Sequence, residues 1–72
     1  MDTPYENLAN AIILQAVRDY RKALRTLSRY PKNRSAQYER GSIERFFRSE
    51  WFGILTNLDP ELLICRLREE AA

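Results

Sequence analysis

The strongest constraint on the fold is a run of apolar residues at helical spacing between residues 5 and 27. Residues 3–6 (Thr-Pro-Tyr-Glu) fit a capping box with Thr3 as N-cap. Pro31 cannot continue a helix, so we expect it to end near Arg29 or Tyr30. The result is one helix of roughly 26 residues, or about 39 Å. Its apolar positions are Tyr5, Leu8, Ala9, Ile12, Ile13, Ala16, Val17, Tyr20, Leu24 and Leu27.

Helix signals also occur in the rest of the chain. Residues 31–35 are typical of a turn, in which Asn33 or Ser35 caps a second helix. We expect that helix to be continuous through Gly41, although a mid-helix glycine costs about 1 kcal/mol relative to alanine. Two alternatives remain beyond it: the helix continues, or it breaks at Ser49, which then caps a short helix over residues 50–56.

The last helix has a clear beginning and a poor end. Residues 59–61 (Asp-Pro-Glu) supply a cap, a first-turn proline and a first-turn acid. At the other end, Glu69 and Glu70 have the wrong charge for a helix C-terminus, which predicts fraying.

These segments predict an all-α fold. Apolar and polar residues do not alternate over any long stretch, and no Asn-Gly or Asp-Gly hairpin signal occurs. We expect a long N-terminal helix packed against an antiparallel second helix and closed by one or two short C-terminal helices. With 72 residues, the chain is expected to form one small domain over residues 1–72. No apolar run approaches the roughly 20 residues of a membrane span, so a cytoplasmic protein is expected.

Composition argues against catalysis. The chain has no histidine, which removes the usual general base near neutral pH and the commonest metal ligand. Its one cysteine, Cys65, lies among apolar residues and is expected to be a buried, inert thiol. We therefore expect no enzyme activity, no catalytic residue, no metal and no cofactor.

Charge is distributed unevenly along the chain. The formal net charge of +2 is the sum of −2 over residues 1–17, +7 over residues 18–48 and −3 over residues 49–72. A basic middle favours a polyanionic or acidic partner. Alternatively, the acidic ends fold back on the middle and neutralise it.

Five cations fall on one face of the predicted first helix, opposite its apolar residues. Such a face suits an acidic groove of a protein or a phosphate backbone, because guanidinium groups bind paired oxygens. The alternative is a solvated helix face whose arginines pair with the acidic C-terminal segment. The candidate partner- or phosphate-binding residues are Arg18, Arg21, Lys22, Arg25 and Arg29, extended into the turn by Lys32 and Arg34.

Aromatic residues are concentrated between residues 46 and 52. The favoured interpretation is that all of them are core, with Phe52 turned inward by a break at Ser49. On an unbroken helix, Phe52 would instead point outward as an interface anchor. Leu14 is also anomalous, because it lies off the main apolar stripe and beside Arg18 and Arg21. The candidate apolar interface residues are Leu14, Tyr38, Trp51 and Phe52.

Most of the chain resembles a known group of small proteins. The resemblance rests on residues 43–52 (IERFFRSEWF), 55–56 and 59–64, and on residues 5–12 and 19–25. Together they resemble small uncharacterised all-helical proteins of prophages and mobile elements of Gram-positive bacteria. The resemblance implies an accessory protein without catalytic residues. Small phage proteins of this kind often bind and block a host protein, including defence nucleases.

The leading hypothesis is accordingly a non-catalytic protein-interaction module that binds a host or phage protein through the basic face of the first helix. The first alternative is a nucleic-acid accessory protein that contacts phosphates through the same residues. The second alternative is a small structural homo-oligomer, such as a homodimer, in which association supports a marginal core.

Overall fold

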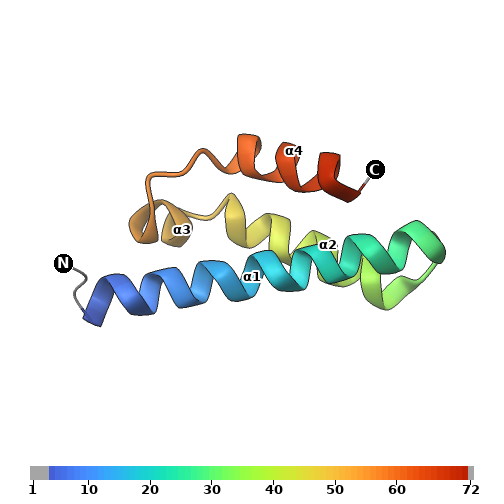
Figure 1. Ribbon diagram of the computed structural model, residues 1–72, viewed down its shortest axis with the longest axis horizontal. Coiled ribbons are helices and arrows are strands. Elements are labelled where there is room, and N and C mark those ends of the chain that lie inside the picture. The colour runs from blue at the N-terminus through green and yellow to red at the C-terminus, as the bar shows by residue number, and fades with distance from the viewer. Residues whose placement is uncertain (1–3, 72) are drawn as a thin grey trace.

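The computed structural model describes residues 4–71, which form four helices joined by short connections (Figure 1). They are α1 (Pro4–Arg29), α2 (Arg34–Phe47), α3 (Glu50–Leu55) and α4 (Pro60–Ala71). No strand occurs within these residues. The all-α prediction is therefore confirmed, as are the length of the first helix and its end at Arg29. The predicted cap, Thr3, lies outside the described residues.

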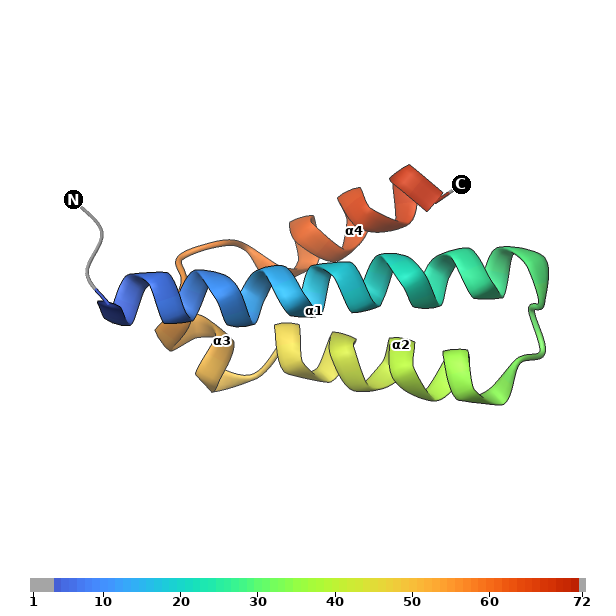
Figure 2. The same ribbon diagram turned by 60° about the horizontal axis from the view of Figure 1, so that its bottom comes forward.

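The long first helix is the spine of the molecule. The molecule measures 42 × 20 × 19 Å, and α1 runs along nearly all of its longest dimension (Figure 2). Residues 30–33 turn the chain back, so that α2 runs antiparallel to α1. After the short α3, the chain crosses back and α4 lies over one side of the α1–α2 pair (Figures 1 and 2). The predicted antiparallel arrangement with two short closing helices is the one observed.

The core lies where α4 meets the helix pair. Tyr20, Phe47 and Phe52 are its largest fully buried side chains, with 0–1% of their surface exposed. Their rings pack edge to face around Phe47, at centroid distances of 5.7 Å to Tyr20 and 5.5 Å to Phe52, a favourable aromatic geometry. The aliphatic members of this core are Ile13 and Val17 of α1, Ile43 of α2, and Ile64 and Leu67 of α4.

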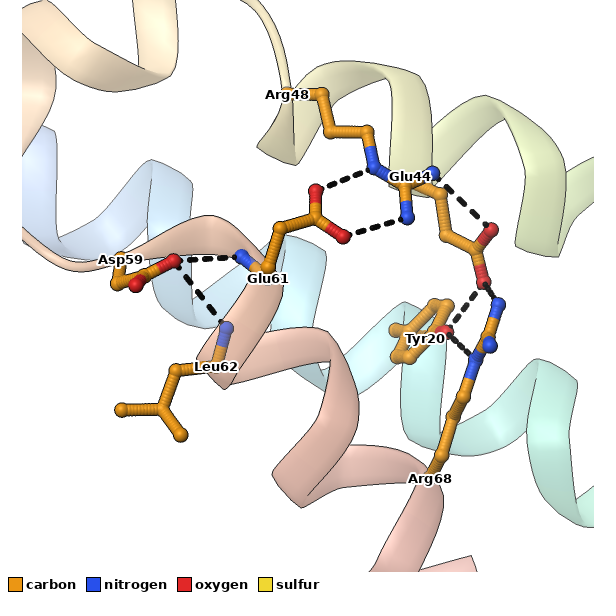
Figure 3. Close-up of polar contacts among 7 residues, drawn as sticks. All are labelled: Tyr20, Glu44, Arg48, Asp59, Glu61, Leu62 and Arg68. Atoms are coloured by element: carbon orange, nitrogen blue, oxygen red, sulfur yellow. Dashed lines mark hydrogen bonds and ion pairs between the residues drawn. The ribbon is translucent and has the colours of Figure 1, made fainter.

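Polar side chains begin each of the later helices. Asn33 Oδ1 accepts a hydrogen bond from Ala36 N (2.9 Å), so Asn33 rather than Ser35 caps α2. Asp59 Oδ1 accepts from Glu61 N (2.9 Å) and Leu62 N (3.3 Å), which confirms the predicted start of α4 (Figure 3). These bonds satisfy amide groups that a helix start leaves without a partner.

Ser49 separates α2 from α3. Its hydroxyl donates to Phe46 O (2.6 Å) and accepts from Phe52 N (3.2 Å), so it ends one helix and caps the next. The expected continuity through Gly41 is confirmed, because α2 runs unbroken to Phe47. The short helix ends at Leu55, one residue before the predicted end.

Two expectations for α4 are wrong. The helix is not frayed at its acidic end but extends to Ala71, and Glu70 pairs there with Arg21 of α1. Cys65 is exposed rather than buried, since the inner face of α4 is formed by Ile64 and Leu67. Its thiol lies 3.5 Å from Glu69 Oε1, as a weak hydrogen bond on the outer face.

No helix within residues 4–71 is both long enough and apolar enough to span a membrane.

Candidate functional site

The seven predicted cationic residues lie together on the surface. Arg18, Arg21, Lys22, Arg25 and Arg29 are exposed on the side of α1 that faces away from the buried Ile13, Val17 and Tyr20. Lys32 in the turn and Arg34 at the start of α2 are exposed as well. We call these seven residues the basic face.

One residue of the basic face is neutralised by the acidic C-terminal helix. Arg21 donates from Nε to Glu70 Oε2 (2.9 Å) and from Nη2 to Glu70 Oε1 (3.2 Å). Both side chains are about half exposed, so this pair contributes little to stability. The other six residues of the basic face form no ion pair within residues 4–71. The acidic segment of α4 therefore leaves most of the basic face open.

Three of the four apolar candidates are exposed. The exposed fraction is 53% for Leu14, 71% for Tyr38 and 54% for Trp51. Phe52 is only 1% exposed, so its candidacy as an outward-facing anchor is wrong and the favoured prediction that it turns inward is confirmed, whereas the expectation that Trp51 is core is wrong. The break at Ser49 changes the direction of the helix and turns the Phe52 ring into the core, where it packs on Phe46 and Phe47.

The three exposed apolar candidates lie on three different helices, and they do not all belong to the basic face. Leu14 belongs to it, because Leu14 precedes Arg18 by four residues and Arg21 by seven on the same side of α1. Tyr38 lies on α2, one turn after Arg34. Trp51 is on α3, where its ring packs edge to face against Phe46 at a centroid distance of 5.8 Å. Leu14 is therefore the apolar candidate in the cationic row of α1, whereas Tyr38 adjoins Arg34 on α2.

A polar network that the sequence analysis missed joins three helices (Figure 3). The Tyr20 hydroxyl donates to Glu44 Oε2 (2.5 Å), and Arg68 donates from Nη2 to the same oxygen (2.7 Å) and from Nε to the Tyr20 oxygen (3.3 Å). We call Tyr20, Glu44 and Arg68 the triad. Tyr20 stands in the middle of the apolar stripe, and a buried tyrosine hydroxyl needs a partner. The need of the Tyr20 hydroxyl for a hydrogen-bond partner was therefore the one sign of this network in the sequence.

Arg48 extends this network along α4. It donates from Nε to Glu61 Oε2 (2.7 Å) and from Nη2 to Glu61 Oε1 (3.0 Å), and its Nη1 lies 3.7 Å from Glu44 Oε1 (Figure 3). The hydrogen bond from Arg48 lowers the pKa of the Glu61 carboxyl. Arginines 48 and 68 thus attach the two ends of α4 to α2.

The environment of the triad alters its titration. Burial raises the pKa of Tyr20, and the hydrogen bond to Glu44 raises it further. Burial also raises the pKa of Glu44, but hydrogen bonds from Tyr20 and Arg68 and the charges of Arg68 and Arg48 lower it more, so the net direction is down. At neutral pH the triad holds a neutral phenol against a carboxylate whose Oε2 already accepts two hydrogen bonds. A carboxylate held in this way joins helices and is a poor proton acceptor.

Within residues 4–71, no three or more Cys, Asp and Glu side chains are placed together to hold a metal ion.

Comparison of the chain with protein-family models, with curated proteins and with solved structures finds no match.

Proposed function

We propose that the protein is a small non-catalytic interaction module that binds an acidic surface of a larger protein through the basic face and Leu14. In a prophage or mobile element, such a module would serve as an accessory protein that binds a host protein. Inhibition of a defence nuclease is one concrete form of this role.

The observation that supports this proposal is the openness of the basic face. Six of its seven cations have no ion-pair partner within residues 4–71, so binding a carboxylate-rich surface breaks few existing contacts. Four of these six are arginines, whose planar groups bind carboxylates through two parallel hydrogen bonds. Leu14 adds an apolar contact at the end of the cationic row, and charged contacts around an apolar anchor are typical of protein interfaces.

Capture from a Gram-positive bacterial lysate, with and without nuclease treatment, tests this proposal. The main variant is Arg18→Glu/Arg25→Glu, which reverses two charges on the basic face. The matched control is Arg45→Glu/Arg66→Glu, which makes the same change in net charge at two exposed residues elsewhere. We expect a protein to be captured with and without nuclease treatment. The captured amount should fall at least tenfold with the main variant and stay unchanged with the control.

A phosphate-binding protein would behave differently in the same experiment. Capture would depend on nucleic acid, the logarithm of the affinity would fall linearly with the logarithm of salt concentration, and Leu14→Ala would have no effect. Protein binding requires that Leu14→Ala weaken the complex. Equal capture by the main and control variants would exclude the basic face from either role.

A further inference from the structure

A second surface lies on a different side of α1 from the basic face. Here α1, α2 and α3 enclose an open groove of about 510 Å³. Its apolar lining consists of Ala11, Ile12 and Ala16 of α1, Ile43 and Phe46 of α2, and Trp51 of α3. We call this the apolar groove.

The shape of the apolar groove is set by the sizes of its side chains. Ala11, Ala16 and Ser42 are small, so the two helix backbones are not covered and a hollow remains between them. Phe46 and Trp51 are large and stand against one another with their rings at 78°. The Trp51 ring is therefore supported on one side by Phe46 while 54% of its surface stays exposed. A supported aromatic side chain loses little conformational entropy when it is covered.

The apolar stripe of α1 extends beyond the helices that cover it. Leu8 and Tyr5, one and two turns before Ile12, are 60% and 58% exposed. Within residues 4–71, α4 lies over the core formed by Val17 and Tyr20 and α3 packs on the N-terminal half of α1, where Ala9 is buried, yet Leu8 and Tyr5 stay exposed. An apolar surface of this extent on a small protein is characteristic of an interaction site.

The lining of the apolar groove carries a single charge, which is negative and whose carboxylate also accepts a hydrogen bond from Gln15 Nε2 (2.9 Å). Asp19 is its one ionisable lining residue, at the end nearer the α1–α2 turn. Glu50 adjoins Trp51 at the other end, is exposed and forms no ion pair with any described residue. Beyond Asp19, Glu39 and Lys22 line a neighbouring polar hollow, which is close to neutral. An occupant with positive charge at its ends fits these surroundings.

The dimensions of the apolar groove indicate a helix as the occupant. Its α1 side runs from Ala11 to Asp19, about 12 Å, which equals roughly two helical turns. A helix laid along two antiparallel helices inserts side chains at positions i, i+3 or i+4, and i+7, and these span the same length. We propose that the apolar groove binds an amphipathic helix of a partner protein, with a lysine or arginine of that helix against Asp19. This proposal does not depend on the function assigned to the basic face.

Selection from a displayed library of 16-residue helical peptides, using the full chain as target, tests this inference. Trp51 is the one tryptophan of the chain, so its fluorescence reports directly on occupation of the groove. We expect the selected peptides to carry three apolar residues at helical spacing with flanking lysine or arginine, and to shift the Trp51 emission to shorter wavelength. Replacing their flanking cations by glutamate should weaken binding at least tenfold.

Two matched variants of the chain complete this test. Ala11→Glu puts a bulky anion into the apolar groove and should abolish binding, whereas Asn10→Glu adds the same charge at a neighbouring exposed residue that does not line it. The inference is overturned if no peptide is enriched, or if the selected peptides are acidic or bind Ala11→Glu as well as the unaltered chain. It is also overturned if sedimentation shows a dimer that Ala11→Glu dissociates, because a second copy would then occupy the groove.

Discussion

At the scale of single residues, Tyr20 connects the three longer helices through one oxygen atom. Its ring is fully buried against Phe47, and its hydroxyl lies between Glu44 of α2 and Arg68 of α4. The two functions of this side chain, apolar packing and hydrogen bonding, can be separated by removing the hydroxyl alone.

The variant Tyr20→Phe keeps the ring and removes that hydroxyl. We expect the free energy of unfolding to fall by about 1–2 kcal/mol, because the partly buried carboxylate of Glu44 loses one of the two donors to its Oε2. Urea denaturation monitored by circular dichroism measures the change. Tyr38→Phe is the control, since Tyr38 is 71% exposed and its change should stay within about 0.5 kcal/mol. Equal effects of the two variants would contradict the role given to the triad.

Glu44 also predicts a dependence of stability on pH. Its pKa in the folded protein lies below the ordinary value of 4.5, so between these two values the unfolded chain binds more protons than the folded one. The contribution of Glu44 to the free energy of unfolding is thus complete above pH 4.5 and is lost as the pH falls through the pKa of Glu44 in the folded protein. We expect Glu44→Gln to be less stable than the unaltered chain at pH 7, with a difference that narrows below pH 4.5. A difference that stays constant down to pH 2 would contradict this prediction.

For single residues, the sequence predicts which cations are exposed better than it predicts which side chains form hydrogen bonds or ion pairs with one another. The exposed cations of α1 follow from helical periodicity, since their angles about the helix axis are opposite those of the apolar residues. The partnership of Tyr20 with Glu44 and Arg68 joins residues 24 and 48 positions apart, which come together through the pairing of α1 with α2 and the placement of α4. Cys65 was misplaced for the same reason, because its neighbours in sequence did not reveal which side of α4 faces the core.

At the scale of elements, the break between α2 and α3 decides which aromatic rings are buried. Ser49 makes the break through hydrogen bonds to Phe46 and Phe52, and the change of direction brings the Phe52 ring into the core. The sequence offered both a continuous and a broken helix here. The immediate neighbours of Ser49, Arg48 and Glu50, are good helix formers, so local preference does not require a break. The burial of Phe52 is the tertiary contribution that favours it.

The variant Ser49→Ala should therefore destabilise the protein by about 1 kcal/mol, the usual cost of losing an N-cap. Thermal unfolding followed by circular dichroism measures the effect. Ser28→Ala is the control, because Ser28 is exposed inside α1 and alanine is the better helix former there. Ser49→Asn should recover most of the loss. If Ser49→Ala were as stable as the unaltered chain, the burial of Phe52 alone would account for the break.

At the scale of the whole molecule, a small core makes stability depend on few side chains. The closing helix contributes Ile64 and Leu67, each 3% exposed, while its links to Arg21 and Arg48 are exposed ion pairs. Exposed ion pairs add little. The attachment of α4 thus rests mainly on these two aliphatic side chains, the partly buried Leu63 and the triad.

We expect Leu67→Ala to lower the free energy of unfolding by about 2–4 kcal/mol, the cost of a cavity at a buried leucine. In a domain of this size, that is a large part of the total. Leu62→Ala is the control on the same helix, because Leu62 is 53% exposed and its loss should cost less than about 1 kcal/mol. Denaturant titration of the two variants gives the comparison. A smaller loss for Leu67 than for Leu62 would contradict the assigned packing of α4.

The short turn at residues 30–33 has a consequence for the speed of folding. It joins the two longest helices directly, so their mutual contacts close a small loop and cost little entropy. Helical proteins rich in such local contacts reach the native state in microseconds to milliseconds. The α1–α2 hairpin is then expected to assemble first, and α4 to dock last and detach most readily. Transient exposure of the core should accordingly begin at Val17 and Tyr20, where α4 lies.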